Sequence, residues 1–193
     1  GERAFDFCEN LREVYDKSQL RVGELSKIEN GDITKYVKTE DIHYTDDYTS
    51  KVSVHEESGC ILYSDGDTVE LIGIRDTVEH VIIPEGVTTI SSYVFYKTRV
   101  IKTLSIAKSV TTIMPYAFAS RCETHDEKGH SHENCDFPLK TIIFLNAEGW
   151  RATSLYGDEP VFFNAIDLTA DPMGAWSKLV LSEYAEWQWV SVE

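Results

Sequence analysis

Basic residues and long apolar runs are both scarce in this 193-residue chain. Its 18 Lys and Arg stand against 33 Asp and Glu, giving a formal net charge of −15. A phosphate backbone would be repelled rather than neutralised by this charge, so nucleic-acid binding is not expected. No apolar run approaches the roughly 18 residues that a membrane-spanning helix needs, and the first residues carry no signal-peptide pattern.

The sequence motifs of common catalytic sites are also missing. There is no Gly-rich phosphate loop, no Gly-x-Ser-x-Gly nucleophile elbow and no His-Glu-x-x-His pair. The segment Ser64-Asp65-Gly66-Asp67 resembles part of a calcium loop, but Val69 and Leu71 stand where further ligands should follow. We therefore expect a protein that is not an enzyme and that needs no cofactor.

What the chain does have is a repeat with a period of 23 residues. Residues 78–95 (VEHVIIPEGVTTISSYVF) are followed by residues 101–118 (IKTLSIAKSVTTIMPYAF), with the apolar positions in register. The matched pairs are Val78–Ile101, Val81–Leu104, Ile83–Ile106, Val87–Val110, Ile90–Ile113 and Phe95–Phe118. One such unit cannot bury its own apolar side, so the period predicts the stacked coils of a mainly β repeat solenoid with short helical segments.

Two further copies of the repeat are altered. Residues 139–144 restart the pattern after an insert at 122–136, and residues 1–11 match the second half of a coil. Because the chain opens in the middle of a coil, either it is a piece cut from a longer array or some other cap replaces the missing half-coil. We expect the cut, since an uncapped end exposes the core to water.

The repeat divides the chain into four parts. Asp65-Gly66 predicts a tight hairpin turn, and Asp32 is a candidate helix N-cap. The parts are a partial N-terminal repeat (1–15), an interrupting segment with a short helix and a β-hairpin (16–74), the repeat coils with the insert (75–146) and a C-terminal cap (147–193).

The cap is predicted to be helical. Asp171-Pro172 is a helix start signal, since proline at the first helical position loses no hydrogen bond. Apolar residues then recur at three- and four-residue spacing and predict a stripe on one helical face: Met173, Trp176, Val180, Tyr184 and Trp187. The stripe either closes the open end of the repeat core or, with Trp187 and Trp189, forms an exposed sugar-binding platform. Repeat arrays need terminal caps, which favours the first interpretation.

These patterns resemble the BspA-type leucine-rich repeat family of bacterial cell-surface proteins. The motifs that carry the resemblance are Val-x-x-Val-x-Ile-Pro-x-x-Val-x-x-Ile-x-x-x-x-Phe and the N-terminal Ala-Phe-x-x-Cys-x-x-Leu. The resemblance implies an extracellular or cell-surface adhesion module that binds a protein or host-surface ligand and has no catalytic residues. A structural spacer of a surface protein is the alternative.

The alternation of side chains along the strands of the coils predicts a binding face. Where Val81, Leu104 and Ile142 point inward, their neighbours point outward. The outward columns on the expected concave side are His80, Thr103 and Thr141, and Ile82, Ser105 and Ile143. These residues either contact the ligand or are only the solvated side of a small sheet.

The insert holds three of the six histidines and two of the four cysteines. Four zinc ligands could come from Cys122, His125, His130 or His132, and Cys135, although the spacing matches no zinc-finger pattern. In the oxidising surroundings that the family resemblance implies, Cys122 and Cys135 would instead form a disulfide. We expect the disulfide, with metal binding and an unpaired solvated loop as the alternatives.

Overall fold

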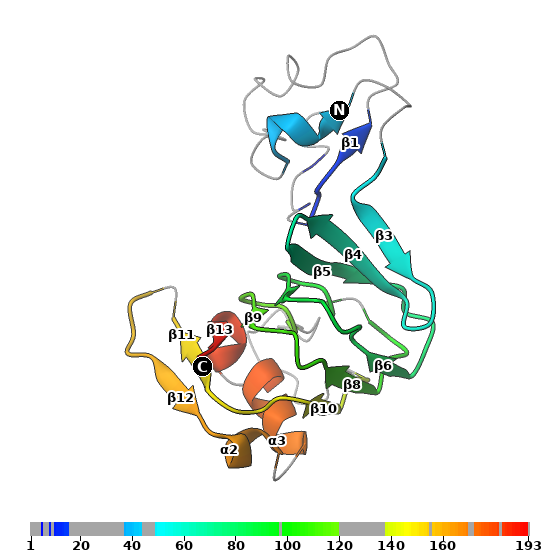
Figure 1. Cartoon of the computed structure of the whole chain (residues 1–193). Helices are drawn as coiled ribbons and strands as arrows, with labels where there is room; N and C mark the ends of the chain where they lie inside the picture. Colours follow the sequence, from blue (N-terminus) through cyan, green and yellow to red (C-terminus); the bar gives the residue numbers. More distant parts are fainter. Residues whose placement is uncertain are drawn as a thin grey trace, which may run out of the picture.

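The computed structural model gives a mainly β protein with short helices (Figure 1). The residues that it describes are 5, 8, 10–15, 37–43, 49–96, 98–119, 138–154, 156–169, 172–181 and 183–192. Within these residues the strands form sheets of two, three and eight strands. The predicted helix near Asp32 and the insert at 122–136 lie outside the described residues.

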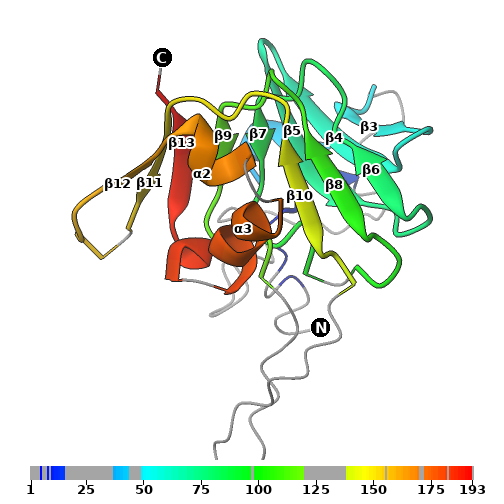
Figure 2. The same cartoon turned by 90° about the horizontal axis from the view of Figure 1, so that it is seen from below.

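The repeats contribute strands to two different sheets. The first half of each unit supplies β6 (His80–Ile82), β8 (Thr103–Ile106) and β10 (Thr141–Phe144), which form a parallel three-stranded sheet. The second half supplies β7 (Thr89–Ile90) and β9 (Thr112–Ile113), which pair in parallel within the eight-stranded sheet. Figure 2 shows β6, β8 and β10 side by side.

The register of both ladders follows the sequence period. Val81 pairs with Leu104, which pairs with Ile142, so the three residues are neighbours across the sheet as the repeat predicts. Thr89 pairs with Thr112 in the second ladder, again 23 positions apart. The predicted alignment of these rungs is therefore confirmed.

The apolar residues of the repeat fill the space between the two sheets. All the matched pairs are buried except Val78, which is half-buried and packs against the same cluster. Phe95 and Phe118 lie in the core, with ring centroids 5.0 Å apart and planes at 4°. Tyr93 and Tyr116 stack in the same way at 5.5 Å, and both have positive φ angles of 59° and 61°. The same backbone conformation thus recurs one repeat later.

A β-hairpin extends the eight-stranded sheet before the first full repeat. Antiparallel β4 (Cys60–Asp65) and β5 (Thr68–Ile74) turn at Gly66, whose φ of 67° is left-handed, as the Asp-Gly pair predicts. β3 (Val52–His55) pairs with β4 on the outer side. β5 pairs in parallel with β7, so the hairpin takes the place that a preceding coil would occupy in this sheet.

A small sheet lies at the far side of the hairpin (Figure 1). β1 (Val14–Tyr15) and β2 (Ile42–His43) pair in parallel, with the 3-10 turn η2 (Thr39–Asp41) directly before β2. Val37 and Ile42 are buried there in a cluster separate from the main core.

The C-terminal part mixes strands and helices, so the prediction of a helical cap is only partly right. Its elements are β11 (Trp150–Thr153), β12 (Val161–Phe163), α2 (Ala165–Thr169), α3 (Pro172–Trp176), the π-helical η3 (Ser177–Leu181), the 3-10 helix η4 (Glu183–Glu186) and β13 (Gln188–Ser191). α3 begins at Pro172 as predicted. A single regular helix from Met173 to Trp187 is wrong, because α3 is followed by a π-helix, a 3-10 helix and then β13. The predicted packing on the core is confirmed for four residues of the stripe: Trp176, Val180, Tyr184 and Trp187.

The helix gives way to a strand because β13 pairs with the last repeat strand, β9, of the eight-stranded sheet. Trp189 of β13 pairs antiparallel with Ile113 of β9, and on its other side β13 pairs with β11. Trp189 is 1% exposed and Trp187 is 9% exposed, so both belong to the core rather than to an exposed aromatic platform. α2 and α3 contact β10, the last strand of the other ladder. The C-terminal part therefore covers this end of both ladders.

Candidate functional site

The two predicted outward columns lie in register on the three-stranded sheet. His80 pairs with Thr103 and Thr103 with Thr141, while Ser105 pairs with both Ile82 and Ile143. Ile82 is 62% exposed and Ile143 is 38% exposed. We call this set the outer ladder face: His80, Ile82, Thr103, Ser105, Thr141 and Ile143. The structure brings all six residues together, and their role in binding remains a prediction.

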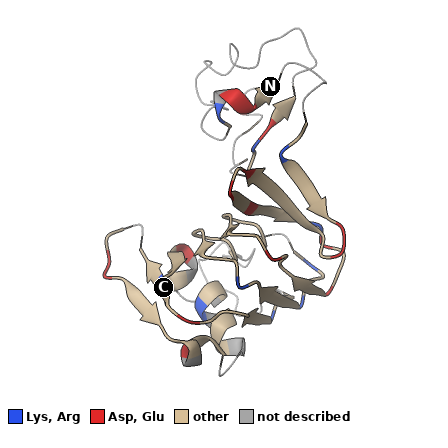
Figure 3. Ribbon diagram, viewed as in Figure 1, with Lys and Arg blue, Asp and Glu red and all other residues tan. Residues whose placement is uncertain are grey.

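Apolar and basic side chains adjoin the outer ladder face. Leu145 follows β10 and is 43% exposed, which extends the apolar surface beyond Ile143. Lys102 and Lys140 directly precede β8 and β10, and basic segments lie beside these strand ends in Figure 3. Lys102 Nζ lies 2.7 Å from Glu79 Oε1, and its hydrogen bond and charge lower the pKa of Glu79. The face thus combines apolar contact area with a locally balanced charged rim.

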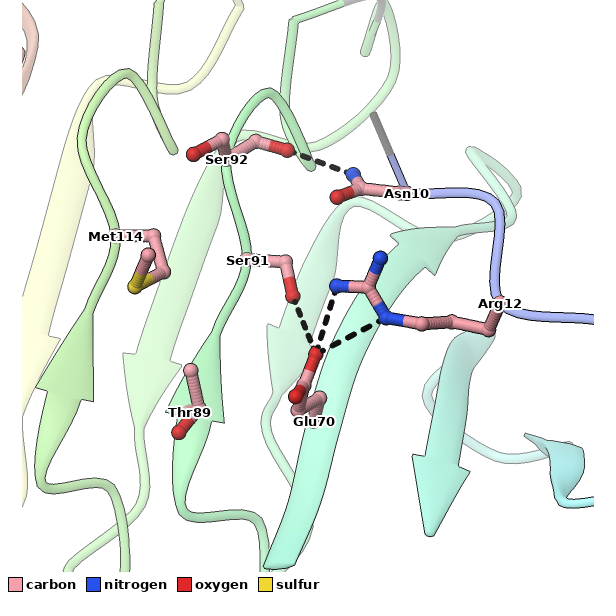
Figure 4. Close-up of a pocket in the computed structure, with 7 residues that line it drawn as sticks. All are labelled: Asn10, Arg12, Glu70, Thr89, Ser91, Ser92 and Met114. Carbon is pink, nitrogen blue, oxygen red and sulfur yellow. Dashed lines mark hydrogen bonds and ion pairs between the residues drawn. The ribbon is translucent and has the colours of Figure 1, made fainter. Parts of the chain in front are cut away.

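A second feature lies on the eight-stranded sheet, where residues 10–12 cross the ends of the repeat strands. A hollow of about 280 Å³ opens there (Figure 4). The residues that line it are Asn10, Arg12, Glu70, Thr89, Ser91, Ser92 and Met114. We call it the crossing hollow.

Two polar contacts hold the crossing segment in place. Arg12 Nη2 donates to Glu70 Oε2 at 2.8 Å, and Arg12 Nε donates to the same oxygen at 3.3 Å. Ser91 Oγ donates to this carboxylate at 3.2 Å. On the other side of the hollow, Asn10 Nδ2 donates to the Ser92 carbonyl at 2.7 Å. Figure 4 shows these contacts on either side of the opening.

No pattern in the sequence predicts the crossing hollow. Arg12 and Glu70 lie 58 residues apart, in two segments that the sequence assigned to different parts of the chain. Charged residues are also abundant, so no spacing argument selects this pair.

The predicted disulfide and metal ligands lie outside the described residues: Cys122, His125, His130, His132 and Cys135. Within the described part of the chain, no three His, Cys, Asp or Glu side chains are placed to hold a metal ion. Cys60 is a buried free thiol, and burial raises its pKa, which keeps it in the unreactive protonated form.

A hydrogen bond with Tyr156 raises the pKa of Tyr116 to about 12.

Comparison with known proteins identifies the repeats. Residues 75–126 match the family model described as "BspA type Leucine rich repeat region (6 copies)". Residues 75–126 are BspA-type leucine-rich repeats. No curated protein and no solved structure matches the chain.

The leucine-rich repeats include β6, β7, β8 and β9, and therefore four residues of the outer ladder face: His80, Ile82, Thr103 and Ser105. Repeats of this family suggest a protein-interaction module and are typically not catalytic. In the described residues, no helix has both the length and the apolar composition that crossing a bilayer requires.

Proposed function

We propose that this chain is a non-enzymatic protein-interaction module that binds its partner through the outer ladder face. We further propose that its 23-residue leucine-rich repeats form a solenoid and that the module belongs to an adhesive protein of the cell surface.

The observation that supports this proposal most is the exposure of two isoleucines on a rigid repeat surface. Ile82 and Ile143 pair with Ser105 from opposite sides, so they lie two strand spacings apart, roughly 10 Å. With Leu145 they form an apolar strip flanked by hydroxyl groups. Interfaces of this kind have an apolar centre and a polar rim.

The scaffold beneath this strip is fixed by the ladder. Ile83 N–H donates to the Ser105 carbonyl at 3.0 Å, and Leu145 N–H donates to the Ile106 carbonyl at 3.0 Å. The inward neighbours Val81, Leu104 and Ile142 are fully buried. Little conformational entropy would therefore be lost when a partner binds, which favours affinity.

The test uses an array of purified host surface proteins probed with the labelled full chain. Ile82→Ser and Ile143→Ser should each weaken any specific binding by about 5- to 30-fold if these residues are central contacts. Phe162→Ser is the matched control, because Phe162 is an exposed apolar residue (68%) on β12 of the other sheet.

A partner whose affinity falls equally with Phe162→Ser and with the two isoleucine variants would contradict the assignment of the face. Absence of any specific binding on the array would favour the alternative of a structural spacer.

A further inference from the structure

We propose that the crossing hollow is a second binding site, for a neutral, polyhydroxylated ligand the size of one sugar unit. The site is independent of the outer ladder face, because its lining residues belong to the eight-stranded sheet and to residues 10–12.

The first argument is the hydrogen-bonding capacity of the lining. Glu70 Oε1, Thr89 Oγ1, Ser92 Oγ and Asn10 Oδ1 make no hydrogen bond with any of the described residues, whereas the other oxygen of Glu70 and the amide nitrogen of Asn10 are used to fix the crossing segment. Carboxylate and amide oxygens accept hydrogen bonds, and hydroxyl groups both donate and accept. Such a set matches a ligand that presents several hydroxyl groups.

The second argument is that the relevant atoms are held in place. Glu70 is fixed by Arg12 and Ser91, and Ser91 itself is buried at 2% exposure. Thr89 lies on β7 between Glu70 of β5 and Thr112 of β9 in the sheet register. Polar groups positioned by a sheet and by a hydrogen-bonded ion pair are preorganised for a ligand, which lowers the entropy lost on binding.

The third argument concerns charge. Arg12 and Glu70 neutralise each other across 2.8 Å, so the lining carries no net charge to attract an ion of either sign. The net charge of −15 further disfavours an anion such as phosphate. A neutral ligand is therefore the class that fits the charge of this lining.

The fourth argument is size and the character of the remaining wall. A hollow of about 280 Å³ is close to the lower end of small-molecule sites, which span about 300–1,000 Å³. Met114 contributes a flexible apolar thioether to the lining, suited to contact the C–H surface of a sugar ring. One sugar unit, free or at the end of a glycan, matches this volume and this mixture of groups.

The experiment is an NMR titration of the full chain, with backbone amide signals followed as methyl glycosides of glucose, galactose, mannose or N-acetylglucosamine are added. At least one probe should shift the amides of residues 89–92 without shifting those of β6, β8 and β10. Inorganic phosphate, added in parallel, should shift residues 89–92 less than that glycoside does.

Three variants locate the site. Thr89→Val and Ser92→Ala each remove one hydroxyl and should weaken glycoside binding by about three- to tenfold. Thr112→Val is the matched control, since Thr112 holds the same position one repeat later but does not line the hollow. Circular dichroism melting checks that all three variants are folded.

The proposal is overturned if no glycoside shifts residues 89–92, if phosphate shifts them more strongly, or if Thr112→Val weakens binding as much as Thr89→Val. Each of these results leaves the proposed protein-binding face untouched, because that face lies on the other sheet.

Discussion

Phe95 and Phe118 stack with nearly parallel rings across one repeat period, with ring centroids 5.0 Å apart and ring planes at 4°. Both side chains are almost completely buried. The Phe95 amide also donates to the Ala117 carbonyl at 3.1 Å, so backbone and side chain are joined at the same level of the stack. These two repeat units are therefore packed against each other, and the loss of one ring should affect the adjacent unit.

The first prediction concerns this pair. Phe118→Ala should lower the free energy of unfolding by about 3–5 kcal/mol, because it removes a buried ring and leaves a cavity. Phe118→Leu, which keeps more of the volume, should cost less. Phe162→Ala is the control: Phe162 is 68% exposed, and its loss should change stability by no more than about 0.5 kcal/mol. Urea denaturation of the three variants measures the difference, and equal midpoints would refute the packing argument.

The second prediction compares two glycines with left-handed backbones. Gly149 and Gly66 have φ angles of 70° and 67°, but a Cβ at Gly149 would overlap the Val192 carbonyl oxygen, whereas nothing lies within 4 Å at Gly66. Gly66→Ala should cost about 1–2 kcal/mol from backbone strain alone. Gly149→Ala should cost more, because the segments before β11 and after β13 must also separate. Thermal melting of both variants decides the point, and a smaller loss for Gly149→Ala would contradict it.

The third prediction concerns pH. The hydrogen bond and charge of Lys102 lower the pKa of Glu79 in the folded chain. A lowered folded-state pKa means that the pair stabilises the fold above the ordinary glutamate pKa, and that this contribution is lost as the pH falls through the folded-state pKa. In Lys102→Met the Glu79 titration midpoint should move up toward the ordinary value. Carboxyl NMR shifts measure both midpoints, and an unchanged midpoint would show that Lys102 is not the cause.

The fourth prediction concerns the cysteines. The expected Cys122–Cys135 disulfide leaves Cys8 and Cys60 as thiols, so thiol counting in denaturant should give two thiols without reductant and four with it. Four thiols without reductant, together with stoichiometric zinc in the purified protein, would instead support the metal-binding alternative. In the native protein Cys60 should resist alkylation, because it is fully buried and its pKa is raised by burial.

The repeat core could be predicted from the sequence because its apolar residues recur at one fixed spacing. Alignment of the units predicts that Val81, Leu104 and Ile142 are neighbours, as they are in the sheet. The hairpin is predicted by the Asp65-Gly66 pair, which favours a tight turn. These features depend on local pattern and on the relation of each unit to the next.

The rest depends on contacts between distant segments that no local pattern encodes. The spacing from Trp176 to Trp187 is helical, yet the chain leaves the helix so that Trp189 can pair with Ile113. β9 pairs with β7 on one side, and its other side is available for β13. The periodicity of the C-terminal sequence carries no information about this distant strand. The Arg12–Glu70 ion pair is of the same kind, since it exists only once residues 10–12 cross the sheet.

The position of β13 also bears on how such an array can change in length. The place beside β9 that a further parallel strand would take is filled by an antiparallel one. A strand of an extra unit added next to β9 would have to displace Trp189 of β13. It would also separate Trp189 from Phe163, on which it stacks. Duplication of a whole 23-residue unit between residues 78 and 118 would add one strand to each ladder and leave the pairing of β13 with the last of them unchanged. In longer variants of this molecule, the additional repeats are therefore expected between existing repeats rather than after the last one.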